Sequence, residues 1–301
     1  GFLAEAGNAL VCAAPPPAGE HLASSTRGWH RLLWELGVPL DFVNADQVSE
    51  ESARQYKMLI LPFPISLPEE IAQKLGAYVY AGGGLVSEVV PGRLDEHGVP
   101  RRGEISPIFA NLFGVSQIGL SVVREPGSPA RWTPRERGWG EFLEPATLQG
   151  DGPLEGYRLP ASLFLQTYEC QGSQPVLKYN SRAAGAFRVG RLGWAWLLGT
   201  CVGHSALAHR SPDTLEFVRN LLAQCKVQPL HKGRLLVRKR AIPGKRAWFF
   251  TNPTGETITE EIWVGGAQVD DLFGQPPGPR GEPAPRRGEG LAVRGLTAGA
   301  R

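Results

Sequence analysis

Hydrophobic residues alternate between short continuous runs and helical spacing over the first two hundred residues of the chain. Residues 9–14 form an apolar run ended by three prolines, which is typical of a buried strand in a parallel sheet. In the following segment Trp29, Leu32, Leu33 and Leu36 recur at helical spacing, and a glycine follows the last of them. The chain is therefore predicted to begin with a strand and an amphipathic helix.

The alternation continues to residue 90. Strand-length apolar runs occupy residues 40–43, 56–62 and 85–90. Ser66 and Glu69 predict a capping box around Pro68, which would open a helix between the last two of these strands. This order of strands and helices predicts an α/β fold, a doubly wound parallel sheet with right-handed crossovers.

The pattern changes after a short helix predicted at 106–114. Residues 117–190 are rich in Gly, Pro and Arg, and we interpret them as an irregular β-rich insertion of antiparallel strands and loops at one edge of the sheet. Regular α/β structure returns with an apolar strand at 193–200 and a helix that begins at Ser211, where a serine cap precedes a proline.

From residue 227 onward, strand-length pieces alternate with Pro-Gly and Asn-Pro-Thr-Gly turns, which predicts a small all-β domain. The predicted domains are therefore residues 1–226 and 227–301. A chain of 301 residues is long enough for both, and its 42% hydrophobic and 20% charged residues are typical of globular proteins.

Composition argues against several classes of partner and cofactor. No apolar run approaches the roughly 18 residues that cross a bilayer, so we expect no membrane partner. The four cysteines lie far apart, and no signal-like segment is visible at the front of the chain. We therefore expect reduced thiols, no metal, no cofactor and a cytoplasmic location. The net charge of +3 hides a basic C-terminal part, but its Arg238–Lys239–Arg240 run is flanked by strand-like residues, so we expect no nucleic-acid partner.

Several short motifs recur in a characteristic order. They are YKMLILP at 56–62, YVYAGGG at 78–84, GRLDE at 92–96, GWAWLLGT at 193–200, FFTNPT at 249–254 and DDLFG at 270–274. In this order they resemble the trimerisation domain and the C-terminal β domain of family-42 β-galactosidases. The trimerisation domain is itself similar to class I glutamine amidotransferases. Residues 117–190 depart most from the family pattern.

The resemblance implies a flavodoxin-like first domain and a second domain that is a small β-sandwich. It also implies a homo-oligomer, with a trimer favoured, and a catalytic barrel in the same or a partner chain that acts on a galactoside-type carbohydrate. A retaining glycosidase needs two carboxylates about 5 Å apart. In this family they sit on a barrel of about 250 residues, and only eight residues precede the first predicted strand. We therefore expect this chain to be the non-catalytic, oligomer-forming and active-site-shaping portion of such an enzyme.

Six residues are candidates for a sugar pocket or an interface. Glu88 and the loop residues Arg93, Asp95 and Glu96 follow a predicted parallel strand at its carboxyl end, where open α/β sheets bind ligands. The alternative interpretation of this stretch is an exposed polar turn. Trp132 and Trp139 lie among arginines and could stack on sugars.

Two other functions compete with this one. The chain could be a free-standing carbohydrate-binding or degenerate amidotransferase-like protein. It could also be an independent hydrolase that uses Cys201 or Glu88. Amidotransferase chemistry needs a cysteine on a strand-to-helix elbow, and residues 85–90 contain none. Cys201 and His204 lie close in sequence but after the final strand of the first domain.

Overall fold

The computed structural model describes residues 1–4, 8, 18–101, 105–123, 141–242, 245–262 and 291–296. The chain divides into two compact units. The first comprises Gly1–Leu33 and Leu40–Gln228, and the second comprises Trp34–Pro39 and Pro229–Arg301. Each unit is considered by itself below.

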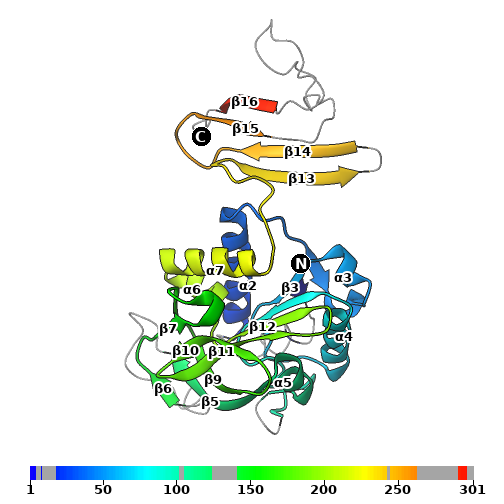
Figure 1. Cartoon of the computed structure of the whole chain (residues 1–301), viewed down its shortest axis with the longest axis vertical. Coiled ribbons are helices and arrows are strands. Elements are labelled where there is room, and N and C mark those ends of the chain that lie inside the picture. Colours follow the sequence, from blue (N-terminus) through cyan, green and yellow to red (C-terminus); the bar gives the residue numbers. More distant parts are fainter. Residues whose placement is uncertain are drawn as a thin grey trace, which may run out of the picture. The chain divides into compact units, whose positions relative to one another are not determined.

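A mixed sheet of 12 strands forms the centre of the first unit (Figure 1). Five neighbouring strands form a continuous parallel part of this sheet, in the order β2-β1-β3-β4-β12. Their bounds are β1 (Phe2–Ala4), β2 (Phe42–Asn44), β3 (Met58–Leu61), β4 (Gly84–Ser87) and β12 (Trp194–Leu198). β1 lies between β2 and β3, so right-handed connections place helices on both faces of these strands. The predicted α/β sheet is confirmed for these five strands, whereas the sheet as a whole is mixed.

The region between residues 115 and 189 extends this sheet mainly with antiparallel strands. Beyond β12 the order continues as β11-β10-β7-β8, while β9 pairs with β11 and β5, and β6 pairs in parallel with β5. The bounds are β5 (Val115–Val123), β6 (Glu141–Leu143), β7 (Thr147–Gly150), β8 (Arg158–Pro160), β9 (Phe164–Cys170), β10 (Gln174–Tyr179) and β11 (Arg182–Val189). The predicted β-rich insertion is thus continuous with the main sheet.

Helices cover both faces of the parallel strands. On one face α4 and α5 bury residues such as Leu75 and Phe109 in a large apolar cluster with β3 and β4, and α2, α6 and α7 gather on the other side (Figure 1). Their bounds are α2 (Ala18–Glu35), α3 (Ser52–Gln55), α4 (Glu69–Tyr80), α5 (Pro107–Phe113), α6 (Val202–Ala208) and α7 (Pro212–Gln224), with short 3-10 helices at η1 (Ala45–Gln47) and η3 (Gly152–Leu154).

Two local predictions at the start of the chain need correction. The first strand is Phe2–Ala4, in the stretch expected to precede the sheet, and the predicted strand at 9–14 lies outside the described residues. Phe2 is 1% exposed, and its N–H donates to Asp41 O over 2.7 Å. Burial and strand pairing therefore stabilise this strand although it has only three residues. The capping box is also wrong. Pro68 occupies the N-cap of α4, and the Ser66 hydroxyl donates instead to Asp95 O.

The second unit contains two antiparallel strand pairs in the described residues. β13 (Leu236–Ile242) pairs with β14 (Lys245–Thr251), and β15 (Ile258–Ile262) pairs with β16 (Leu291–Leu296). Residues 267–272, one of the strand-length pieces of the predicted β domain, lie outside the described residues. A small apolar cluster of Leu235, Val237 and Ile258 holds β13 and β15 together, and Trp248 and Phe250 of β14 pack against it.

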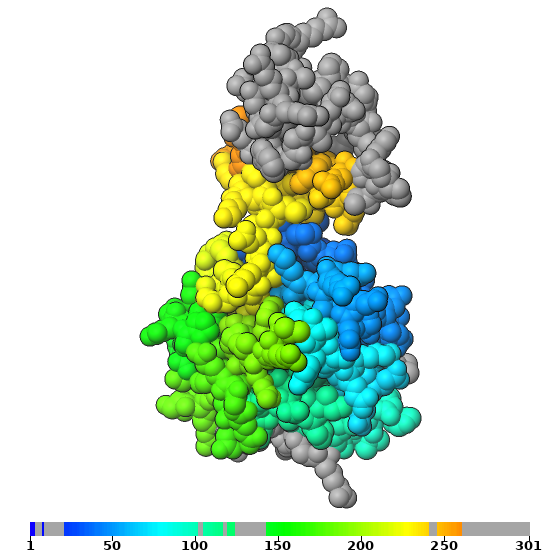
Figure 2. Space-filling model, turned by 45° about the vertical axis from the view of Figure 1, so that its right-hand side comes forward, coloured from blue at the N-terminus to red at the C-terminus, as the bar shows by residue number. Residues whose placement is uncertain are grey.

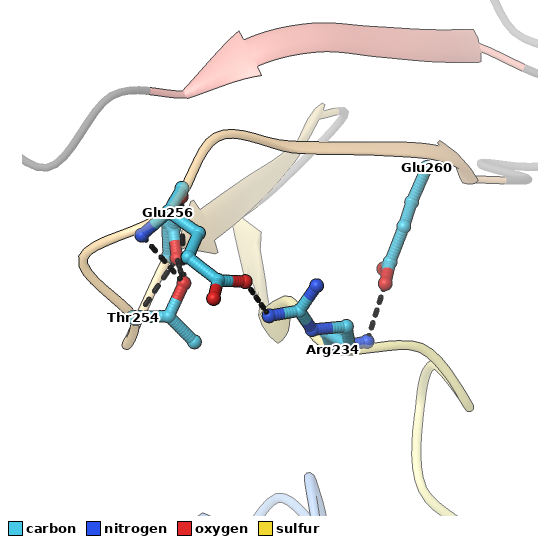
Figure 3. A network of polar contacts seen from close by, with 5 residues as sticks. Arg234, Thr254, Glu256 and Glu260 are labelled. Carbon is cyan, nitrogen blue, oxygen red and sulfur yellow. Dashed lines mark hydrogen bonds and ion pairs between the residues drawn. The ribbon is translucent and has the colours of Figure 1, made fainter.

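A polar network fastens β15 to the segment before β13 (Figure 3). The Glu260 carboxylate accepts hydrogen bonds from the N–H groups of Arg234 and Leu235 and lies 2.6 Å from His231 Nε2. Nη2 of Arg234 lies 2.7 Å from Oε2 of Glu256, which precedes β15 by two residues. The network therefore adds polar contacts between β15 and the segment before β13, in a unit whose apolar cluster is small.

Candidate functional site

The carboxyl end of β4 carries a buried carboxylate at Glu88, which is 0% exposed. Its Oε1 accepts hydrogen bonds from Trp29 Nε1 and Gly203 N, both at 2.7 Å. Its Oε2 accepts from Ser25 Oγ at 2.5 Å and from Phe63 N at 2.8 Å. Four donors therefore surround one carboxylate, and each of its oxygens accepts two hydrogen bonds.

These four donors come from three separate parts of the first unit. Ser25 and Trp29 lie one turn apart on α2, Phe63 follows β3, and Gly203 lies in the first turn of α6. The first N–H groups of a helix have no partner within the helix, and the helix dipole favours a negative charge there. Glu88 thus supplies the missing cap of α6 from a distant strand and joins two helices to the sheet.

Burial and hydrogen bonding act on this carboxyl group in opposite directions. Burial raises the pKa of Glu88 above its ordinary value, and the hydrogen bonds from Ser25, Gly203, Phe63 and Trp29 offset part of that rise. Only the Ser25 hydroxyl can both donate and accept. A proton on Glu88 can therefore be accommodated only on Oε2, with the Ser25 hydroxyl turned to accept it.

Strained backbone surrounds Glu88. Phe63, Val90 and Leu163 have positive φ values of 43°, 57° and 61°, in a region that bulky side chains rarely adopt. All three are buried in one apolar cluster. Residues of this kind cost about 1–3 kcal/mol each and persist only where the surrounding structure fixes them.

Two buried amide side chains hold the strained segments in place. Asn8 donates to Phe63 O and accepts from Ser66 N, both at 3.0 Å. The Gln166 side chain accepts from Val90 N at 3.0 Å and from the Tyr168 hydroxyl. No local sequence pattern could have identified these two side chains, because each contacts backbone groups that lie 55 or more residues away along the chain.

The loop that follows Glu88 is built around Asp95. Its Oδ1 accepts hydrogen bonds from His97 N at 2.9 Å and Val99 N at 2.8 Å, and these bonds, that of Val99 foremost, lower the pKa of Asp95. Glu96 is exposed and lies 3.7 Å from Arg101 Nη2. Arg93 is half-buried, and its N–H donates to Val90 O. Asp95 therefore shapes the turn, while Glu96 is the carboxylate that faces solvent.

The structure separates the predicted site residues from one another. Glu88 is in the interior, whereas Asp95 and Glu96 lie in a surface turn, so the four carboxyl-end candidates do not form one pocket wall. Trp132 and Trp139 lie outside the described residues. Within the described part of the chain no group of three or more His, Cys, Asp or Glu side chains is placed to hold a metal ion. No helix in that part is long and apolar enough to cross a membrane.

Cys201 and His204 also differ from the predicted pair. Cys201 is 0% exposed in the apolar cluster that contains Phe63 and Val90, which is not the electropositive, accessible setting that activates a thiol. His204 Nδ1 lies 2.8 Å from Ser162 Oγ, a contact that sequence reasoning missed. Ser162 is itself 0% exposed, so a substrate could not reach its hydroxyl in this conformation.

The chemistry open to this site is therefore limited. Glycoside hydrolysis needs a nucleophile and an acid that both reach the anomeric carbon. The Glu88 carboxylate is enclosed and already accepts four hydrogen bonds, so its geometry suits a structural role.

Comparison with known proteins agrees with this architecture. The family model described as the beta-galactosidase trimerisation domain matches residues 13–224, more than half of the chain. The chain belongs to this family. The match supports the non-catalytic portion of a β-galactosidase and gives no support to a free-standing carbohydrate-binding or amidotransferase-like protein.

Curated relatives match over a short stretch. The chain is 29% identical to beta-galactosidase GanA of Bacillus subtilis over 89 residues, which are 30% of this chain and 13% of that protein. It is 27% identical to beta-galactosidase BglY of Alicyclobacillus acidocaldarius over 101 residues, which are 34% of this chain and 14% of that protein. These matches cover well under two thirds of either enzyme.

Solved structures show the same fold over most of the chain. A β-galactosidase of glycoside hydrolase family 42 from G. stearothermophilus superposes with a TM-score of 0.67 at 19% identity, over 91% of this chain and 37% of that one. The β-galactosidase from Bacillus circulans sp. alkalophilus superposes with a TM-score of 0.68 at 14% identity, over 98% of this chain and 40% of that one. The trimerisation-domain chain therefore spans about two fifths of these enzymes.

Proposed function

We propose that this chain forms the oligomer-forming and active-site-shaping portion of a cytoplasmic β-galactosidase that acts on a galactoside. The catalytic barrel would lie in the same or a partner chain, and three copies would assemble. In this proposal residues 1–226 are the trimerisation domain, with a flavodoxin-like core, and residues 227–301 are a C-terminal β-sandwich. The family match over residues 13–224 supports the assembly role.

The observation that carries the non-catalytic role is the enclosure of Glu88. Open α/β sheets bind ligands at the carboxyl ends of their strands. Here that position is filled by the chain's own Ser25, Trp29, Phe63 and Gly203, which direct their donors at Glu88. The position that would carry chemistry in a related enzyme thus serves here to hold two helices on the sheet.

The loop beyond Glu88 is proposed to border the sugar pocket of the assembled enzyme. Glu96 presents a solvent-facing carboxylate, and Asp95 fixes the turn that carries it. Arg93 stands at the base of the same loop. Trp132 and Trp139 are proposed to contribute stacking surfaces to this pocket or to the interface beside it.

Sedimentation velocity combined with an activity assay tests the proposal. We expect the purified chain to sediment as a trimer, at three times its 32.6 kDa mass, and to release no nitrophenol from nitrophenyl β-galactoside. A chain that stays monomeric across a wide concentration range would contradict the assembly role. Galactoside turnover that is lost in Glu88→Gln would contradict the non-catalytic role.

A further inference from the structure

Two histidines of the first unit lie side by side near the carboxyl ends of the parallel strands. His21 is on α2 and His204 is on α6, and their ring centres are 5.7 Å apart with the ring planes at 80°. His204 follows β12, and the His21 ring contacts Phe63, which follows β3. Both histidines are half-buried. Figure 2 shows the opposite end of these strands, where the yellow-green surface around residue 190 borders the cyan surface of the α4–β4 region.

The backbones that carry the two histidines are in direct contact. A Cβ placed on Gly203, the residue before His204, would lie 2.0 Å from the backbone oxygen of Ser25, one turn after His21 on α2. The Glu88 carboxylate joins the same two segments, because it accepts hydrogen bonds from Ser25 Oγ and from Gly203 N. The positions of the two rings are therefore set by tightly packed backbone, and a ligand that binds both needs no rearrangement of α2 against α6.

A hydrogen bond fixes the orientation of the His204 ring. Its Nδ1 lies 2.8 Å from Ser162 Oγ. Ser162 is itself held by Thr200, whose Oγ1 accepts from Ser162 N at 2.8 Å and donates to Ser162 O at 3.1 Å. Histidines that bind metal ions almost always engage their second ring nitrogen in such a hydrogen bond, which selects the tautomer and makes the other nitrogen the ligand. For His204 the ligand atom would be Nε2.

The distance between the two rings suits a shared metal ion. Imidazole nitrogens bind Zn²⁺ at about 2.0–2.1 Å, so two rings on one tetrahedral ion have centres about 5 Å apart. Small side-chain rotations would bring the observed 5.7 Å to that value. The His21 ring meets Phe63 edge-on, and Phe63 stacks on Phe164. Apolar residues beside a metal site control the access of solvent to it.

We propose that His21 and His204 together bind a divalent transition-metal ion such as Zn²⁺. Imidazole is a ligand for Zn²⁺, Cu²⁺ and Ni²⁺, whereas Ca²⁺ and Mg²⁺ take oxygen ligands. Within the described ranges no third His, Cys, Asp or Glu joins the pair, so we assign the remaining coordination positions to water. The sequence predicted no metal because its cysteines lie far apart, whereas this pair contains no cysteine and its members meet only in the fold.

The bound ion has a structural consequence. It links α2 to α6 beside Glu88, and a ligand that binds only the folded state stabilises that state. The site does not depend on the proposed assembly function, so either can fail without the other.

Isothermal titration calorimetry with ZnCl₂ tests the site in the 301-residue chain after treatment with a chelator. The variants are His21→Gln, His204→Gln and Ser162→Ala. The matched control is His97→Gln, which removes an exposed imidazole from the surface loop. Circular dichroism verifies the fold of each variant and gives its melting temperature with and without Zn²⁺. If a histidine variant does not fold, NMR of the histidine side chains during a Zn²⁺ titration of the wild type identifies the ligands without a substitution.

We expect the wild type and His97→Gln to bind one Zn²⁺ per chain with the same affinity and to melt at a higher temperature when it is bound. His21→Gln and His204→Gln should each lose this binding. Ser162→Ala should weaken it by about 10–100-fold, because the His204 ring loses its orienting hydrogen bond. Undiminished binding in either His21→Gln or His204→Gln, or no binding by the wild type, would overturn the proposal and leave the pair as a packing contact. NMR shifts at other histidines in place of these two would overturn it as well.

Discussion

Replacement of Glu88 by glutamine is the most direct test of the buried hub. The substitution keeps the shape of the side chain but turns one carboxylate oxygen into an NH₂ donor. On the Oε1 side this group would face Trp29 Nε1–H and Gly203 N–H, neither of which can accept a hydrogen bond. On the Oε2 side it would face the Ser25 hydroxyl, which can turn to accept, and Phe63 N–H, which cannot. The amide nitrogen should therefore lie toward Ser25.

The magnitude follows from the groups that lose their acceptor. One buried N–H, that of Phe63, is left unpaired, at a cost of about 1–3 kcal/mol, and the remaining bonds lose their charged acceptor. We expect Glu88→Gln to lower the free energy of unfolding by about 2–5 kcal/mol. In Glu88→Ala all four donors lose their acceptor, at a cost of about 4–12 kcal/mol. A loss of this size is comparable to the total stability of a typical domain, about 5–15 kcal/mol.

Urea denaturation followed by circular dichroism measures these differences. The control is Glu96→Gln, the same chemical change at an exposed residue whose ion-pair distance to Arg101 is 3.7 Å, and we expect it to change stability by less than about 1 kcal/mol. If Glu88→Gln were as stable as Glu96→Gln, the carboxylate would not hold α2 and α6 to the sheet, and the structural role assigned to it would be refuted.

The same variants show a difference in pH dependence. Burial raises the pKa of Glu88 in the folded state above the ordinary value of 4.5. At a pH just above 4.5 the unfolded chain has therefore lost this proton, whereas the folded protein still holds it. The stability gained from this proton is fully present below pH 4.5 and is lost as the pH rises through the raised pKa. We expect the free energy of unfolding of the wild type to fall across this window, and that of Glu88→Gln to lack this component.

Two further predictions concern packing and the second unit. Gly28→Ala on α2 should lower the free energy of unfolding by about 3 kcal/mol or more, because the new Cβ would lie 1.7 Å from the backbone oxygen of Gly203. Gly76→Ala on α4 is the matched control, because its Cβ would meet nothing within 4 Å. We expect it to raise the free energy of unfolding by about 0.5–1 kcal/mol in the same denaturation assay. For Glu260, burial alone would raise the pKa, but hydrogen bonds led by that from His231 lower it, so stability is present above pH 4.5 and is lost as the pH falls through the lowered pKa. An NMR titration of Glu260 should show this pKa moving up toward 4.5 in His231→Ala, and an unchanged pKa would refute the pairing.

The elements that could be predicted from the sequence are those with a local pattern. The spacing of Trp29, Leu32 and Leu33 predicted α2, because all three face the core and are at most 3% exposed. Ser211 followed by proline predicted the start of α7, where the Ser211 hydroxyl accepts from Asp213 N. In both places neighbouring residues carry the whole signal.

The features that could not be predicted depend on partners far away in the chain. Glu88 after a strand has the appearance of a polar turn, yet its four donors lie 25, 59, 63 and 115 residues away in sequence. Ser66 matched a capping pattern, but its hydroxyl donates a hydrogen bond to the carbonyl of Asp95, 29 residues later in the chain. Strand Phe2–Ala4 has three residues, too few to show a period. Hydrogen bonds between residues so far apart in the chain cannot be predicted from the residues next to either partner.

The need for a charged residue in this interior follows from the backbone around it. Two of the four donors to Glu88, Phe63 N and Gly203 N, are backbone groups, which every residue except proline would retain at those positions. The first points inward because Phe63 has a φ of 43°, and the second because α6 begins against α2, where Gly28 and Gly203 meet without side chains. An apolar residue at position 88 would avoid the cost of burying a charge but would leave both N–H groups without an acceptor. The carboxylate is therefore required by the path of the chain, and its conversion to a sugar-binding or catalytic group would first require that path to change.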